Sequence, residues 1–229
     1  MKKIIIAIDG HSSCGKSSLA KALGYALGYA YVSTGDMYRA VTLYFIQNGV
    51  SLEDAGAVHE ALRNIRLHFE HDGQANRIFL NGQDVSQEIR KMPVANLVSP
   101  VAAIPEVRRE MVRQQQAMGT RKGLVMDGRD IGTVVFPKAE LKIFLTASVD
   151  ERARRRFEEL KEKGQCVSFE EVKSNLLERD RIDSTRADSP LLQAHDALLL
   201  DNTFFNLEQS VEVALDMVRA VLAKLDSPA

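Results

Sequence analysis

The feature that most constrains the fold is a glycine-bounded loop near the start of the chain. Residues 10–17 read Gly-His-Ser-Ser-Cys-Gly-Lys-Ser, which matches the phosphate-loop pattern G-x-x-x-x-G-K-[ST]. Residues 3–9 before it form a short apolar, β-branched run, typical of a strand buried in a parallel sheet. Residues 16–27 after it carry apolar side chains at helical spacing. A strand, a loop and a helix start in this order direct backbone N–H groups and the helix dipole at one point, so the stretch predicts an anion-binding site.

The phosphate-loop pattern predicts roles for particular side chains. We expect Lys16 to reach the β- and γ-phosphates of a nucleotide and the Ser17 hydroxyl to bind Mg²⁺. The alternative is a chance match in an ordinary strand-turn-helix unit. The residues expected to surround the phosphates of ATP are Gly10, His11, Ser12, Ser13, Cys14, Gly15, Lys16, Ser17 and Ser18.

Composition narrows the class of protein. The chain has 229 residues, of which 45% are apolar, so it can bury a large core. Its net charge of −1 gives no general attraction to nucleic acid or to an anionic membrane, and we expect neither as a partner. The two cysteines, Cys14 and Cys166, lack metal-ligand spacing and favour a reducing compartment. With no signal peptide or membrane-spanning run, the expected location is the cytoplasm, and we expect a monomer.

A second polar cluster follows the next predicted strand. Residues 29–33 have strand character, and residues 34–39 read Thr-Gly-Asp-Met-Tyr-Arg at the start of a helix that reaches Phe45. Open α/β sheets bind their ligands at the carboxyl ends of strands, so this cluster is a candidate site. A capped helix with a solvated arginine is an equally simple interpretation.

An antiparallel segment interrupts the alternation of strand and helix. Residues 51–54 resemble a capping box, which predicts a helix toward Ile65. Residues 65–70 then alternate in polarity, a turn is expected at Asp72-Gly73, and residues 77–80 lead into Asn81-Gly82, a hairpin signal. We therefore expect an insertion over residues 51–104. Pro93 and Pro100 interrupt its last part, where the chain returns to the core, and Pro105 suits the first turn of a helix reaching Met118.

Three further apolar runs complete a parallel sheet. Residues 124–127, 141–145 and 197–200 are predicted strands, and the first ends in Asp127. An aspartate at this place, downstream of a phosphate loop, is typical of a residue that holds Mg²⁺. The expected fold is an α/β class with a five-stranded parallel sheet flanked by helices and interrupted twice, once by the small antiparallel insertion.

Arginines gather in the helical segment that follows the predicted strand 141–145. Arg152, Arg154, Arg155 and Arg156 follow a helix start at Ser148 and Glu151, and a charge run of this kind is often a solvated face. Further on, a helix expected to begin at Ser168 and Glu171 carries residues 179, 183 and 186 on one face, where an intrahelical salt-bridge ladder is the simpler interpretation.

The arginines near strand ends favour phosphoryl transfer between two nucleotides. Their phosphate oxygens repel one another, so cations must offset charge on both substrates. A regulatory GTPase would need a base-reading N-K-x-D sequence, which this chain lacks.

Four motifs together resemble the bacterial cytidylate kinases. They are the loop 10–17, the stretch 34–39, the string Asp-Gly-Arg-Asp-Ile-Gly-Thr-Val-Val-Phe-Pro over 127–137, and the pattern Arg179-Asp180-x-x-Asp183-x-x-Arg186. The likeness runs from the first strand to the last helix, and the 127–137 string is its most specific part. It implies a nucleoside monophosphate kinase that transfers phosphate from ATP to CMP and dCMP with Mg²⁺. The implied division is a core (1–50, 105–148 and 191–229), a monophosphate-binding insertion (51–104) and a helical lid (149–190).

The resemblance also implies roles for single residues. Thr34, Ser99, Arg108 and Asp130 would surround the cytosine, with Tyr38 in the same motif as Thr34, while Arg39 and Arg129 would hold the CMP phosphate. Arg179 and Arg186 would approach from the far side, and Asp183 would meet the ribose. Arg152 and Arg156 are the candidates for clamping the moving phosphoryl group. The residues expected to act in catalysis are Lys16, Arg129, Arg152, Arg156 and Asp127, with Ser17 and Asp127 on the metal.

Two departures from the family pattern stand out. Residues 11–14 replace the small residues and second glycine that are usual in the loop, and Thr34 replaces a serine. Two other functions stay open from the residues alone. One is a phosphate-loop kinase for another small acceptor, and the other is a nucleotide-binding module without catalysis.

Overall fold

The computed structural model describes residues 2–71 and 76–226. The chain divides into two compact units, one formed by the residues up to Tyr29 and from Lys122 onward, the other by Ala30–Arg121. No helix within the described ranges is long and apolar enough to cross a membrane.

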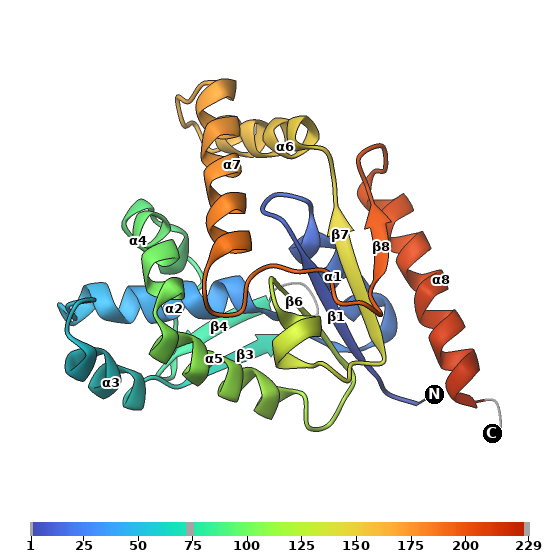
Figure 1. Cartoon of the computed structure of the whole chain (residues 1–229), viewed down its shortest axis with the longest axis horizontal. Helices are drawn as coiled ribbons and strands as arrows, with labels where there is room; N and C mark the ends of the chain where they lie inside the picture. Colours follow the sequence, from blue (N-terminus) through green and yellow to red (C-terminus); the bar gives the residue numbers. More distant parts are fainter. Residues whose placement is uncertain (1, 72–75, 227–229) are drawn as a thin grey trace. The chain divides into compact units, whose positions relative to one another are not determined.

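The first unit is built on parallel strands. These are β1 (Ile5–Gly10), β6 (Leu124–Gly128), β7 (Leu141–Thr146) and β8 (Leu198–Asp201), in the spatial order β6-β1-β7-β8. Figure 1 shows β1, β7 and β8 running in the same direction. They belong to a five-stranded sheet, as the sequence predicted.

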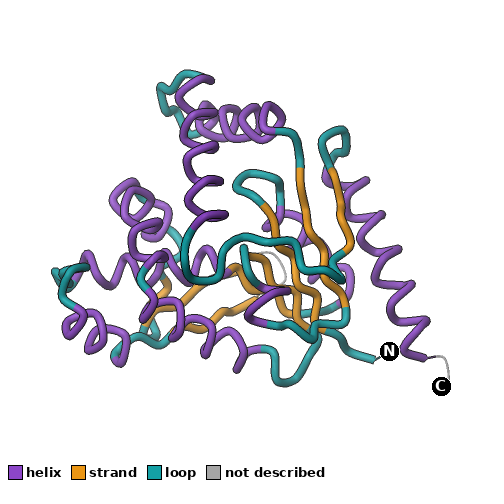
Figure 2. Tube along the Cα trace, viewed as in Figure 1, coloured by secondary structure: helices purple, strands orange, loops and turns teal. Residues whose placement is uncertain are grey.

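Helices cover this sheet. Every residue of β1 is buried, which explains its unbroken apolar sequence. Helix α1 (Lys16–Leu27) packs on β6 and contacts α8 (Leu207–Asp226), which follows the last strand. The alternation of orange strands and purple helices is visible along the tube in Figure 2. The α/β class is thus confirmed.

Two further helices of this unit, α6 (Val149–Glu162) and α7 (Phe169–Thr185), pack against each other. The predicted starts are confirmed, since Ser148 caps α6 and Ser168 forms a capping box with Glu171 on α7. Ala153, Val172 and Leu176 form a small apolar core between the two helices. This pair therefore has packing of its own, apart from the sheet (Figure 1).

The second unit begins with β2 (Ala30–Ser33) and α2 (Thr34–Gln47). Three more α-helices follow at α3 (Ala55–Arg63), α4 (Met92–Ala103) and α5 (Pro105–Met118). Helix α2 contacts α4 and, less extensively, α3 and α5, so it lies at the centre of this unit.

The expected antiparallel sheet is present in this unit. It has the order β3 (Leu67–His71), β4 (Asn76–Leu80) and β5 (Gln83–Asp84). Asn81 and Gly82 join β4 to β5 with φ of 51° and 85°, as a tight hairpin turn requires. The turn expected at Asp72-Gly73 lies outside the described residues.

Two details differ from the sequence prediction. Helix α3 begins at Ala55 with Asp54 as its cap, whose side chain accepts a hydrogen bond from the Ala57 amide, so a capping box over 51–54 was wrong. The segment with two prolines forms α4, because Pro93 sits in the first turn, where no backbone donor is needed, and Pro100 is accommodated inside the helix.

Candidate active site

The phosphate loop has the backbone that its glycines permit. A Cβ on Gly10 would lie 2.0 Å from the Leu145 carbonyl oxygen, so no other residue fits there. Gly15 has φ of 90°, a left-handed conformation that favours glycine and leads directly into α1. The loop therefore turns sharply between β1 and α1, with the N-terminus of the helix at its end.

Lys16 is held inside this loop. Its ammonium donates to the His11 carbonyl oxygen at 2.5 Å and lies 3.7 Å from the Cys14 sulfur. Burial, and after it the nearby Arg129, lower the pKa of Lys16. Withdrawal of Lys16 from water makes its charge more effective toward an anion that enters the loop.

The two residues predicted to hold Mg²⁺ lie together. The Ser17 hydroxyl donates to Asp127 Oδ2 at 3.0 Å, with Asp127 at the end of β6 beside β1. Hydroxyl and carboxylate oxygens are ligands that Mg²⁺ prefers, and this ion usually completes its shell with water and substrate phosphates. The pair fits a Mg²⁺ site of that kind.

Arg129 connects the phosphate loop with α7. One guanidinium nitrogen donates to Ser12 Oγ at 2.8 Å, and another donates to Asp183 Oδ2 at 2.7 Å. Burial acts to raise the pKa of Asp183, but Arg129 and then Arg186 outweigh it and hold that pKa below its usual range. Asp183 is therefore a carboxylate that keeps this arginine in place.

Arg152 of α6 reaches the same loop. Its Nη1 donates to the Ser12 carbonyl oxygen at 3.2 Å and to Asp180 Oδ2 at 2.6 Å, while its Nε donates to the Ala147 carbonyl oxygen. The other Asp180 oxygen lies 3.4 Å from His11 Nδ1. Two predicted arginines, Arg129 and Arg152, thus converge on Ser12.

Arg155 and Asn202 form a further link, which the sequence reasoning missed. Arg155 donates to the side chain and to the carbonyl oxygen of Asn202, at 3.1 and 2.8 Å, and Asn202 donates to the Cys14 carbonyl oxygen at 3.0 Å. These bonds join α6, the segment after β8 and the phosphate loop. Within a charge run, no pattern separates Arg155 from its neighbours, but the polar residues after the last strand were a usable signal.

The other predicted residues of α7 and α6 have more local contacts. Arg156 pairs with Glu159 of its own helix at 2.7 Å, and Arg186 donates to the Ser189 carbonyl oxygen. Arg186 also lies 3.8 Å from Asp183 Oδ1. Arg179 lies on α7, two turns before Arg186 at the C-cap of that helix, and within electrostatic reach of Asp183.

Asp130 follows Arg129 and is buried, with 4% of its surface exposed. It precedes a single π-helical turn (Ile131–Val135), and its carbonyl oxygen accepts from the amides of Val134 and Val135. No pattern in the sequence predicted this turn. It fixes the backbone of a residue expected to recognise a base.

The second unit carries the remaining predicted substrate residues. Arg108 of α5 is 2% exposed, its guanidinium carbon lies 5.6 Å from the centre of the Tyr38 ring, and its Nη1 donates to the Ala102 carbonyl oxygen. Thr34 is buried at the start of α2, and Ser99 is half-buried on α4. A buried guanidinium held over an aromatic ring within cation–π distance is a donor suited to a planar base.

Arg39 lies near the middle of α2, and its Nη1 donates to the Ile89 carbonyl oxygen at 3.5 Å. Asp36 on the same helix pairs with Arg90 at 3.2 Å. Burial raises the pKa of Asp36, and Arg90 and Arg39 act against it. Arg90 was not predicted as a site residue, and its sequence context, next to the two-proline segment, gave no signal for it.

Comparisons with known proteins cover nearly the whole chain. A family model described as "Cytidylate kinase" matches residues 6–220. A curated protein of Bacteroides thetaiotaomicron named cytidylate kinase is 55% identical over 93% of this chain and 95% of its own length. One from Flavobacterium johnsoniae with the same name is 52% identical over 99% of this chain and all of its own. The chain belongs to the cytidylate kinase family.

Solved structures agree with the fold of this cytidylate kinase family member. A shikimate kinase from Bacteroides thetaiotaomicron is similar with a TM-score of 0.50 and 11% identity, over 95% of this chain and 99% of that one. An uncharacterised protein from Eubacterium ventriosum reaches a TM-score of 0.52 with 11% identity over 96% of this chain and 99% of that one. At such low identity these likenesses support the fold alone.

Proposed function

We propose that the protein transfers the γ-phosphoryl group of ATP to CMP and to dCMP, with ADP and CDP or dCDP as products. Its relatives carry the name cytidylate kinase at more than half identity over nearly the whole chain. Within the molecule, the strongest support is the convergence of Arg129 and Arg152 on Ser12 of the phosphate loop. Cations from separate elements at one loop suit a reaction that brings many phosphate oxygens together.

The loop amides and Lys16 would bind the ATP phosphates, with Ser17 and Asp127 holding Mg²⁺. When bound, Mg²⁺ neutralises charge on the β- and γ-phosphate oxygens. Arg155 and Asn202, which link α6 to the loop, would hold the loop in the shape that binds the ATP phosphates.

On the acceptor, Arg39 and Arg129 would hold the phosphate, with Arg179 and Arg186 as further cations and Asp183 on the ribose. Recognition of the base is assigned to Arg108 and Asp130, with Thr34, Tyr38 and Ser99 in support. Cytosine has an amino donor at N4 beside acceptors at N3 and O2, so a carboxylate and a guanidinium complement it. Uracil would place its O4 lone pairs against the Asp130 carboxylate, which predicts poor use of UMP.

No side chain needs to act as a nucleophile. An oxygen of the CMP phosphate attacks the γ-phosphorus directly, the bond from that phosphorus to the β-phosphate oxygen breaks, and ADP leaves. Lys16, Arg129, Arg152 and Arg156 would offset the charge on the phosphoryl group in transit. The rate would come from positioning and charge neutralisation.

We further propose that residues 149–190 act as a lid and 51–104 as the monophosphate-binding segment, between core parts 1–50, 105–148 and 191–229. The lid would exclude water, because transfer to water would waste ATP. A lid built from α6 and α7 is supported by their own apolar core. We also propose that the protein is a monomer and works in the cytoplasm, which suits its free thiols at Cys14 and Cys166.

A coupled assay of ADP release tests this function with CMP, dCMP, UMP, AMP and GMP as acceptors. We expect turnover with CMP and dCMP far above that with the other three. Comparable rates with AMP or UMP would contradict the assignment of the base. ATP binding without CMP-dependent turnover would indicate a nucleotide-binding module instead.

A further inference from the structure

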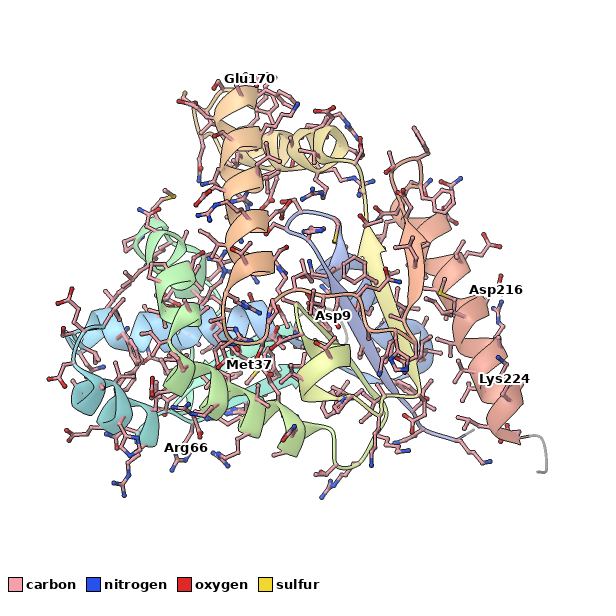
Figure 3. All side chains as sticks on the ribbon, in the orientation of Figure 1. Asp9, Met37, Arg66, Glu170, Asp216 and Lys224 are labelled. Carbon is pink, nitrogen blue, oxygen red and sulfur yellow. The ribbon has the colours of Figure 1, made fainter. Side chains whose placement is uncertain are left out.

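Asp9 is a buried carboxylate to which the reaction described above assigns no task. It is the last residue before Gly10 on β1, and only 5% of its surface is exposed. Its Oδ1 accepts the Ile131 amide at 2.8 Å, and its Oδ2 accepts the Gly132 amide at 2.7 Å. Asp9, labelled in Figure 3, therefore joins the start of the chain to a segment more than 120 residues away.

These two amides open the π-helical turn Ile131–Val135. The first N–H groups of any helical turn lack partners within the turn and need an acceptor from elsewhere. Asp130 occupies the capping position, but its side chain makes no capping hydrogen bond. Asp9 supplies both acceptors from the neighbouring strand, so the turn is capped by a residue remote in sequence.

Close packing at Gly132 fixes the same contact from the other side. A Cβ on Gly132 would lie 3.2 Å from Asp9 Oδ2 and 3.1 Å from Lys142 Cδ. Lys142 cannot move away easily, because its buried ammonium donates to the Pro137 carbonyl oxygen and to Asp196. The segment after Asp130 is thus held between Asp9 and Lys142.

The carboxylate is kept here against an electrostatic cost. Burial raises the pKa of Asp9 to about 6, and the nearby Asp130 adds to this, while the two amides and Lys16 act in the opposite direction. An apolar residue on β1 would avoid that cost but would leave the Ile131 and Gly132 amides buried without acceptors. The need for an acceptor at the Ile131 and Gly132 amides therefore explains a carboxylate at this buried position.

We propose that Asp9 is a positioning residue that fixes residues 128–132 and thereby orients Arg129 and Asp130 for the acceptor nucleotide. The proposal rests on the function proposed above for these two residues. It predicts that loss of the Asp9 contacts impairs use of CMP more than use of ATP, although Asp9 adjoins the phosphate loop in sequence.

The variant Asp9→Asn tests this, because it keeps the shape but turns an amide NH₂ toward one of the two backbone donors. We expect the KM for CMP to rise at least ~5-fold, the factor that corresponds to one lost hydrogen bond, and the preference for CMP over UMP to fall. The KM for ATP should change less than ~2-fold. Gly132→Ala, which disturbs the same contact from the other side, should give the same pattern, and the exposed Asp216→Asn on α8 should behave as wild type.

Hydrogen exchange of the Ile131 and Gly132 amides gives a readout that needs no activity. Both should exchange at least ~10-fold faster in folded Asp9→Asn than in the wild type, with β6 and β7 unchanged. Equal rises in the two KM values, or unchanged exchange and unchanged CMP use, would overturn the proposal. If the wild type lacks activity on CMP while the exchange result holds, the proposed function fails and the capping role of Asp9 stands. If Asp9→Asn does not fold, Gly132→Ala decides the matter by the same two readouts.

Discussion

The raised pKa of the buried Asp9 predicts how the free energy of unfolding changes with pH. Its pKa is about 6 in the folded protein, against 3.8 as the ordinary value. A difference of about 2 units corresponds to ~3 kcal/mol in the free energy of unfolding. The folded state binds the proton more tightly than the unfolded state does, so protonation of Asp9 stabilises the folded protein. This stabilisation is fully present below pH 3.8 and is lost as the pH rises through about 6.

Asp9→Asn has no proton to lose at this position. We therefore compare the free energy of unfolding of the wild type with that of the variant. The difference, wild type minus variant, should fall by ~2 kcal/mol between about pH 4.5 and 7.5, which is most of the ~3 kcal/mol expected over the whole titration. Urea unfolding followed by circular dichroism at several pH values in this interval measures both proteins. Only the change with pH is predicted, because the lost hydrogen bond shifts the variant by a constant amount.

Asp216→Asn is the matched control. Asp216 lies on α8 with 67% of its side chain exposed, so this variant should give a curve parallel to that of the wild type (Figure 3). Parallel curves for the wild type and Asp9→Asn would refute the reasoning. A difference that grows with pH would mean that the two amide donors outweigh burial and lower the pKa of Asp9.

Three other substitutions test the site. Lys16→Ala should lower kcat at least ~10²-fold through the loss of charge stabilisation, and near-normal turnover would remove Lys16 from the mechanism. Asp130→Asn should reduce the ratio of kcat/KM for CMP over UMP more than it slows CMP itself, and an unchanged ratio would exclude Asp130 from base recognition. Asn202→Ala should raise the KM for ATP ~5-fold by breaking the link from Arg155 to the loop, with little change in the KM for CMP, and an effect confined to CMP would contradict this link.

Much of the fold was predictable because its signals are local. Strand β1 is buried on both faces and reads as an apolar run, while Gly10 and Lys16 mark the loop after it. The hairpin at Asn81-Gly82 was predicted for the same reason, since its positive φ angles restrict the residue types.

What the sequence did not reveal depends on contacts between distant residues. The π-helical turn at Ile131 is capped by Asp9, and no local pattern reports a cap from another strand. Helix α4 was missed because Pro100 argues against a helix, although the packing of α4 on α2 and α5 supports it. Tertiary contacts outweigh local preference in both places.

In the candidate site, too, some residues were predictable from local signals and others depend on contacts between distant residues. Ser17 and Asp127 were predicted from a motif and a strand end, and they lie 3.0 Å apart. Arg152 and Arg155 stand in one charge run with Arg154 and Arg156, and only the three-dimensional contacts separate those that reach the loop or Asn202 from those that pair along the helix.

A crystal structure of the complex with CMP tests the central claim most directly. The account predicts that N4 of the cytosine donates a hydrogen bond to the Asp130 carboxylate and that the CMP phosphate lies on the Arg129 guanidinium. A base bound away from Asp130, with well-ordered CMP, would contradict the recognition of cytosine and leave only an ATP-binding protein of the same fold.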